Sequence, residues 1–464
     1  MGIPVYFKTC INNYNLICLE KINKTNYLFF DLNCLIHPCC KDLTNEKIMI
    51  ENIIYKLNNL IQMVNPSKLI YIAIDGPCPK PKIIQQRIRR FKSANENKIW
   101  DTNAITPGTK FMENLEIKIS EYIKTLKTKV IFSGCLEKGE GEHKIFQYIN
   151  QHKLNTNIVV YGLDADLIML SMIVNCDSIY LLRETTEYNL ENVNSDYIYL
   201  DINKLKVQIK QSVKNIFDYI FICFLLGNDF IQNTPSINLR YNGLEYLTNI
   251  YSSFDNDFYL IDINFDLHFK NFKKFIEKLK INENKRLKYI LNIREKQELK
   301  FKNSKNTSLH DPIIKRNKEK YIFSDLSNWR SKYYLQILFN QTEQVQNLDK
   351  KIEKMCINYI QTLLWTKDYY FKECKAWRFS YNYNYAPSLF DIYNILDKFT
   401  DFDYTKDNLP YSSKEQLKMV LPLKSHNLLY KNTIIDILMY PTNPQKSHIL
   451  KRYEWESILI LPKL

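Results

Sequence analysis

Seven acidic residues in this sequence stand where they could converge on a cation. They come from five short segments, most of which end an apolar run or contain a glycine. These residues are Asp31, Asp75, Glu140, Glu142, Asp164, Asp166 and Asp229. A single Asp after a strand usually caps a helix or a turn. Several carboxylates at one edge of a sheet repel one another unless cations neutralise them, so together they favour a metal site.

The spacing of these residues indicates the chemistry. Asp164 and Asp166 are separated by one residue, so both carboxylates would point to one face of an extended strand end. Glu140 and Glu142 flank a glycine in GEGEHKIF, which we expect to open a helix. Carboxylate oxygens prefer Mg²⁺ or Mn²⁺. Two such ions about 4 Å apart activate a water and stabilise the leaving oxygen in phosphodiester hydrolysis. The acidic set therefore predicts a phosphodiesterase with two metal ions.

A basic segment, PCPKPKIIQQRIRRFK, follows Asp75 almost directly, and its prolines favour a helix start. Four of its side chains then share one helix face, namely Lys82, Gln86, Arg89 and Arg90. A lysine, an amide and two arginines suit a terminal phosphate. A solvated basic face or a localisation signal would have the same composition. The position just after Asp75 favours phosphate binding.

Two aromatic side chains are candidates for stacking on a base. His37 lies in DLNCLIHP, six residues after Asp31, and Trp377 lies in an AWRF segment. Such rings can hold a terminal base without reading its sequence. Packing in the core is the more common role for aromatic residues, and it applies to most rings in this chain.

The elements that must position these residues alternate along the first half of the chain. Short apolar runs predict strands at Tyr27–Asp31, Leu69–Asp75, Lys129–Ser133 and Ile158–Asp164. Helical spacing between them predicts helices over Asn45–Val64 and Thr109–Lys127. We therefore expect an α/β fold with a largely parallel central sheet flanked by helices. Ligands of such sheets bind outside the carboxyl ends of the strands, where three of these runs place an Asp.

Composition divides the chain into three parts. Residues 1–251 form the predicted α/β domain, which carries the acidic site and the phosphate pocket. Residues 252–320, rich in Lys, Asn, Asp and Glu, predict a charged helical and loop connector. Residues 321–464 predict a second, aromatic-rich helical domain packed on the first.

Charge and composition restrict the classes of partner. The formal net charge of +14 favours nucleic acid as a ligand, because phosphate contacts need Lys and Arg. No apolar run is long enough to span a bilayer, so we expect no membrane partner, and MGIPVYFKTC lacks the features of a secretory signal. The eleven cysteines form no CxxC pair, which predicts reduced thiols and no structural zinc. We expect a cytoplasmic rather than a nuclear protein.

With these residues in place, the sequence resembles the Xrn family of 5′→3′ exoribonucleases, as a compact member. The resemblance rests on the strings MGIPVYF, DLNCLIH, IDGPCPKPKIIQQRIRRFKSA, NAITPGTKFM, SGCLEKGEGEHKI, YGLDADLIML, LLRE, FLLGNDFI, NWRSKYY, EQLKMVLP and YEWESILILP, and on the stretch 365–387. GEGEHK, GLDADL and GNDF in this order are specific together, although each alone is weak. The resemblance covers nearly the whole chain except 252–320.

The resemblance implies a magnesium-dependent, processive enzyme that converts 5′-monophosphorylated single-stranded RNA to 5′-mononucleotides. It implies that the seven acidic residues bind metal and act in catalysis, and that the four residues of the basic face bind the 5′-phosphate. It further implies that His37 and Trp377 stack on the terminal base. We expect a monomer.

The sequence also departs from the family pattern. Cys34 replaces a usual glycine, which would tighten the turn leading to His37, and Phe379 replaces a second Trp near Trp377. The stretch between Arg90 and Asp101 is short, and we expect the C-terminal domains of the large members to be absent. The expected absence of the C-terminal domains bears on partner binding and processivity rather than on the chemistry, whereas Phe379 bears on the stacking role of Trp377.

Two other functions share parts of this pattern. A structure-specific 5′ flap nuclease acting on DNA would have the same acidic rim and parallel sheet, but the second aromatic segment argues against it. A catalytically inactive RNA-binding scaffold would have no use for the repulsion between seven carboxylates.

Overall fold

The computed structural model describes residues 5–14, 18–94, 96, 99–185, 195–302, 308–340, 346–399, 402, 408–431 and 433–464. The chain forms two compact units. Unit 1 comprises Met1–Ile216, Glu373–Phe379 and Thr405–Ile435, and unit 2 comprises Phe217–Lys372, Ser380–Tyr404 and Asp436–Leu464. The start of the MGIPVYF string and part of the stretch between Arg90 and Asp101 lie outside the described residues.

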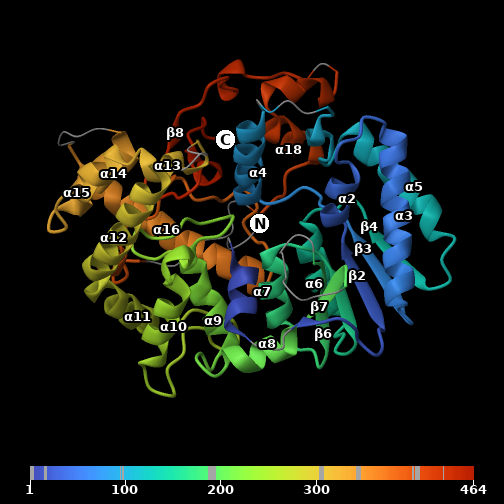
Figure 1. The fold of residues 1–464 in the computed structure, drawn as a ribbon, viewed down its shortest axis with the longest axis horizontal. Helices are drawn as coiled ribbons and strands as arrows, with labels where there is room; N and C mark the ends of the chain where they lie inside the picture. The colour runs from blue at the N-terminus through green and yellow to red at the C-terminus, as the bar shows by residue number, and fades with distance from the viewer. Residues whose placement is uncertain are drawn as a thin grey trace. The chain divides into compact units, whose positions relative to one another are not determined.

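Unit 1 is built on a sheet of seven strands within the described residues (Figure 1). The strands are β1 Cys18–Leu19, β2 Tyr27–Asp31, β3 Leu69–Ala73, β4 Lys129–Ser133, β5 Ile158–Tyr161, β6 Ile179–Glu184 and β7 Tyr197–Asp201. Their order across the sheet is β1-β7-β6-β5-β2-β3-β4. Strands β2 to β6 pair in parallel, and β7 runs antiparallel to both β6 and β1. The predicted α/β fold with a largely parallel sheet is confirmed.

Helices cover both faces of this sheet in unit 1. The helices of unit 1 are α1 Tyr6–Asn13, α2 Asn33–Cys39, α3 Glu46–Val64, α4 Lys80–Ser93, α5 Lys110–Ile123, α6 Gly141–Gln151, α7 Ala165–Ile173, α8 Ile202–Ile209 and α18 Ser413–Val420. Because side chains alternate along a strand, Leu28 and Phe30 of β2 join the core formed with α3 and α5. The ring of Phe29 instead faces that of Tyr148 on α6, 6.2 Å away. Both faces of β2 are therefore buried.

Unit 2 is mainly helical. Its helices are α9 Ile216–Cys223, α10 Gly243–Ser252, α11 Phe269–Ile281, α12 Glu283–Lys302, α13 Asp311–Ile314, α14 Asn317–Ile322, α15 Trp329–Phe339, α16 Leu348–Phe371 and α17 Leu389–Ile395, with a small sheet of β8 Lys446–Ser447 and β9 Ile458–Leu459. Trp329 and Trp365 are buried, as expected for aromatic residues of a core. No helix in the described parts of the chain is both long and apolar enough to cross a bilayer.

Candidate metal site and phosphate pocket

Three of the predicted carboxylates meet at the carboxyl end of the sheet. Asp31 is the last residue of β2, and Asp75 follows the neighbouring parallel strand β3 by two residues. Glu142 lies in the first turn of α6, which packs against both strands. One carboxylate oxygen from each of these three residues lies within 4.8 Å of the others, so they could hold a metal ion. We call them the acidic cluster.

A glycine allows this close approach. The backbone amide of Gly141, at the start of α6, donates a hydrogen bond of 2.7 Å to Asp75 Oδ1. A Cβ atom at Gly141 would lie 2.9 Å from Asp31 Oδ1 and 3.5 Å from Asp75 Oδ1. Any larger residue would therefore press on the carboxylates. The positive end of the α6 dipole also points toward the acidic cluster and favours negative charge there.

The electrostatics of Asp31 fit a cation. The side chain is 2% exposed, and Oδ1 accepts no hydrogen bond from any described residue. Burial, together with the charges of Asp75 and Asp164, raises its pKa to about 8. Burial and the neighbouring Glu140 likewise raise the pKa of Glu142 well above its usual range. A divalent ion would supply both the missing partner for Oδ1 and the missing positive charge.

The raised pKa of Asp31 predicts how stability depends on pH without metal. The pKa is about 8 in the folded chain against an ordinary value of 3.8, so between these values the folded state binds the extra proton. The resulting stabilisation is complete below pH 3.8 and is lost as the pH rises through about 8. In chelator, the melting temperature should therefore fall across this window more steeply than that of Asp31→Asn, which cannot ionise. Parallel melting curves for the two proteins would contradict this.

Asp164 and Asp166 lie on a helix and not on a strand, so the predicted strand geometry is wrong. β5 ends at Tyr161, and Asp164 is the N-cap residue of α7, with Asp166 in its first turn. The chain leaves the strand at Gly162, where a Cβ atom would meet Leu167 Cδ1 at 2.2 Å. Asp166 is buried, and the charge of Asp164 contributes to the raised pKa of Asp31. The remaining predicted ligand, Asp229, belongs to unit 2, two residues beyond Gly227.

The cysteine that departs from the family pattern contacts the acidic cluster. Cys34 lies in α2, and its thiol donates a hydrogen bond of 3.1 Å to Asp31 Oδ2. Its sulfur accepts a hydrogen bond of 3.4 Å from the backbone amide of Leu163, in the segment that leads to α7. Cys34 thus connects the end of β2 to the segment that carries Asp164. All eleven cysteines are free thiols.

Lys144 is a positioning residue that sequence reasoning missed. Its ammonium is buried and donates hydrogen bonds of 2.8 Å each to the carbonyl oxygens of Ile74 and Gly134. These carbonyls belong to the segments that follow β3 and β4. Lys144 therefore fixes the backbone immediately before Asp75. Its burial lowers the pKa of the ammonium to about 8.

The predicted basic face lies on α4 and is largely buried, which excludes a solvated face for three of its four members. Lys82, Gln86 and Arg90 are 5 to 7% exposed, whereas Arg89 is exposed. Burial, with a contribution from Arg89, lowers the pKa of Arg90 to about 9. Its Nη1 makes no hydrogen bond with the described residues. A buried guanidinium with an unused donor fits an anion.

Lys82 and Gln86 of this face contact side chains from other segments of unit 1. Lys82 Nζ lies 2.5 Å from Glu140 Oε2 and 3.9 Å from Glu142 Oε1. Gln86 accepts a hydrogen bond of 3.5 Å from Gln416 of α18. The basic face and the acidic cluster are therefore direct neighbours. Nothing in the separate sequence motifs gave this contact, although GEGEHK and the basic segment each supplied one side of it.

The two candidate stacking residues also lie in unit 1. His37 is an exposed residue of α2. Trp377 is buried, its carbonyl accepts a hydrogen bond of 2.8 Å from the amide of Lys80 at the start of α4, and Lys138 Nζ lies 5.5 Å from its ring centre. Trp377 thus lies beside the helix of the basic face.

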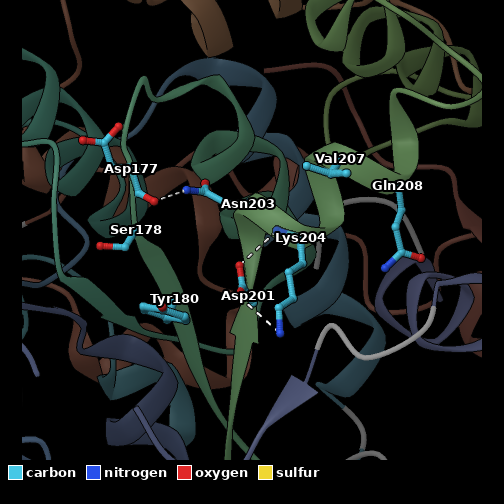
Figure 2. A pocket seen from close by; sticks show the side chains of 8 residues that line it. All are labelled: Asp177, Ser178, Tyr180, Asp201, Asn203, Lys204, Val207 and Gln208. Carbon is cyan, nitrogen blue, oxygen red and sulfur yellow. Dashed lines mark hydrogen bonds and ion pairs between the residues drawn. The ribbon is translucent and has the colours of Figure 1, made fainter. Parts of the chain in front are cut away.

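A separate hollow in unit 1, of about 330 Å³, is not part of this site (Figure 2). It is lined by Asp177, Ser178, Tyr180, Asp201, Asn203, Lys204, Val207 and Gln208. Residues 177–180 stand at the amino end of β6, which runs parallel to β5 and hence to β2. Because Asp31 ends β2, the hollow and the acidic cluster lie at opposite edges of the sheet.

Two family models match this chain. The family model described as XRN 5′-3′ exonuclease N-terminus matches residues 1–99 and 92–185, and the model described as Xrn1 helical domain matches 210–325 and 325–464. The chain is 27% identical to 5′-3′ exoribonuclease 1 of Homo sapiens and 25% identical to that of Schizosaccharomyces pombe, over 100% of its own length in both cases. It covers 33% and 47% of those relatives.

Among solved structures, the catalytic core of Rad2 in complex with DNA substrate has a TM-score of 0.38 and 11% identity, over 90% of this chain and 98% of that one. The assignment of the family rests on the two family models, which together match most of the sequence. The chain therefore belongs to the Xrn family, as its motifs predict.

Proposed function

We propose that this chain is a 5′→3′ exoribonuclease that hydrolyses 5′-monophosphorylated RNA to 5′-mononucleotides. The observation that carries the proposal is the position of Lys82 of the basic face, whose Nζ lies 3.9 Å from Glu142 of the acidic cluster and 2.5 Å from the adjacent Glu140. A site that binds a terminal phosphate beside metal-binding carboxylates suits cleavage close to that terminus. The names of the relatives, 5′-3′ exoribonuclease 1, support the same reaction.

The acidic cluster would hold Mg²⁺ or Mn²⁺, with Glu140, Asp164 and Asp166 as further ligands of a two-ion site. When bound, the metal supplies Lewis-acid stabilisation of the reacting phosphate and a more acidic water. Lys144 holds the backbone before Asp75 so that its carboxylate keeps its direction. Asp229, in unit 2, stays a prediction from the sequence as a further ligand.

The other residues would orient the RNA. Arg90 and Gln86, joined by Lys82 and Arg89, would bind the 5′-phosphate, and Arg90 offers a donor without a partner among the described residues. His37 and Trp377 would stack on the first base. Hydrolysis at the first linkage releases a mononucleotide and leaves a new 5′-phosphate, which can occupy the same pocket. The buried position of the pocket would exclude a cap by size.

The pocket predicts a preference among 5′ ends. With Mg²⁺, RNA with a 5′-monophosphate should be degraded about 10–100-fold faster than the same RNA with a 5′-hydroxyl or a cap, since hydrogen bonds to charged groups contribute about 1.5–3 kcal/mol. Arg90→Gln should reduce this ratio. Lys47→Gln, at a side chain that is 84% exposed on α3, should leave it unchanged. Nucleotide release would be measured over time.

Three outcomes would contradict the proposal. Equal degradation of all three RNAs would remove the pocket assignment. Faster cleavage of a DNA flap than of RNA would favour a flap nuclease. Absence of any Mg²⁺-dependent or Mn²⁺-dependent nucleotide release would favour an RNA-binding scaffold.

A further inference from the structure

The ammonium group of Lys82 links the basic face of α4 to the carboxylates. Lys82 belongs to the basic face of α4, yet its Nζ lies 2.5 Å from Glu140 Oε2 and 3.9 Å from Glu142 Oε1. The three side chains are 9% exposed or less, so solvent screens these charges weakly. Without metal, Lys82 therefore neutralises part of the negative charge that the carboxylates share.

The ammonium of Lys82 cannot bind a phosphate while it is paired with Glu140. The proposed function requires the lysine of the basic face to contact an anion, and this inference rests on that function. A lysine side chain is a flexible point charge that can change partner, unlike the planar fork of an arginine. Lys82 thus has two possible partners, the glutamates and the 5′-phosphate.

We propose that a divalent metal and Lys82 compete for the same carboxylates, so that metal binding releases Lys82 toward the 5′-phosphate. A cation bound by Asp31, Asp75 and Glu142 would stand next to an ammonium that is only 3.9 Å from Glu142. Two positive charges that share a carboxylate repel each other strongly in a buried site. The metal also neutralises the glutamates, which removes the attraction that holds Lys82.

The other buried lysine of the site cannot make this exchange. Lys144 Nζ donates to two backbone carbonyls, of Ile74 and Gly134, which a metal at the carboxylates does not neutralise. The proposed 5′-phosphate pocket, to which Lys82 would move, contains a second group suited to an anion. Arg90 on the same helix face has a buried donor without a partner in the described residues, which suits an anion that Lys82 could bind as well. Metal loading would therefore prepare the pocket for a 5′-phosphate.

The exchange predicts that removing the ammonium helps the metal. In calorimetric titrations without RNA, Lys82→Met should bind Mn²⁺ more tightly than the unmodified protein, by about threefold or more, because no internal cation must be displaced. The rise in melting temperature on adding Mn²⁺ should also be larger for this variant. Lys47→Met, at an exposed lysine of α3, is the matched control and should match the unmodified protein in both measurements.

A second experiment determines the position of the Lys82 side chain directly. A crystal structure of the unmodified protein with Mn²⁺ at the acidic cluster should show Lys82 Nζ beyond ion-pair distance, about 4 Å, from Glu140. Unchanged or weaker Mn²⁺ binding by Lys82→Met, or an intact pair of Lys82 and Glu140 with the metal bound, would overturn the exchange. Neither result depends on nuclease activity. A chain that fails to degrade RNA would refute the proposed function without altering the metal titrations.

Discussion

Asp75→Asn should reduce RNA hydrolysis by about 10²–10³-fold, the scale seen when one group that stabilises a transition state is removed. Asparagine has nearly the same shape, and its Oδ1 can still accept the 2.7 Å hydrogen bond from Gly141. The variant therefore loses a charged metal ligand without losing the local fold. Binding of 5′-phosphorylated RNA should persist, because the basic face of α4 is unchanged. Single-turnover rates and RNA affinity would be measured together.

Asp177→Asn is the matched control for this variant. Asp177 is exposed and lines the hollow at the opposite edge of the sheet, so its replacement should leave the hydrolysis rate unchanged. Near-normal turnover by Asp75→Asn would show that this carboxylate does not bind the catalytic metal. A loss of RNA binding that equals the loss of turnover would instead indicate a folding defect.

Gly141→Ala should lower metal affinity and turnover by at least about tenfold, although alanine is the better helix former. The added Cβ would lie 2.9 Å from Asp31 Oδ1, a contact that neither the buried carboxylate nor the backbone of α6 can easily relieve. Helix propensity acts in the opposite direction, by up to the about 1 kcal/mol that separates alanine from glycine in a helix interior. The melting temperature in chelator should therefore change little while the Mn²⁺ affinity falls.

Because the added methyl group affects the metal site and the helix in opposite directions, Gly141→Ala can distinguish a role in metal binding from a role in folding. Calorimetric titration with Mn²⁺ and a melting curve in chelator would separate the metal site from the fold. If Gly141→Ala binds Mn²⁺ as tightly as the unmodified protein, the carboxylates of Asp31 and Asp75 do not hold the metal beside Gly141. A large fall in melting temperature would mean that the glycine serves the packing of α6 rather than the metal.

Local signals predicted the elements that carry the site. The strand Tyr27–Asp31 and the strand Lys129–Ser133 match the prediction to the residue, because an apolar run in each is bounded by polar residues. The helix predicted over Asn45–Val64 begins at Glu46, with Asn45 as its cap accepting from two backbone amides. Such signals lie within a few residues of one another and need no knowledge of the fold.

Contacts between distant segments could not be predicted in the same way. Asp164-x-Asp166 was placed on a strand because the apolar run reaches it, but Gly162 ends the strand first and the pair opens a helix. A lysine in a charged helix is usually exposed, so nothing local indicated that Lys144 is buried against two carbonyls. Likewise, the bond between Cys34 and Asp31 depends on where α2 packs.

The strand order has a consequence for how such a site can arise. β2 lies between β3 and β5, although the chain reaches β5 only after β4. The connections on the two sides of β2 therefore leave toward opposite faces of the sheet, which opens a crevice at its carboxyl end, a topological switch point. The position of this switch point follows from the strand order alone and does not depend on the side chains. A chain with the same acidic residues, but with β5 added beyond β4, would place them on a sheet without a switch point at β2.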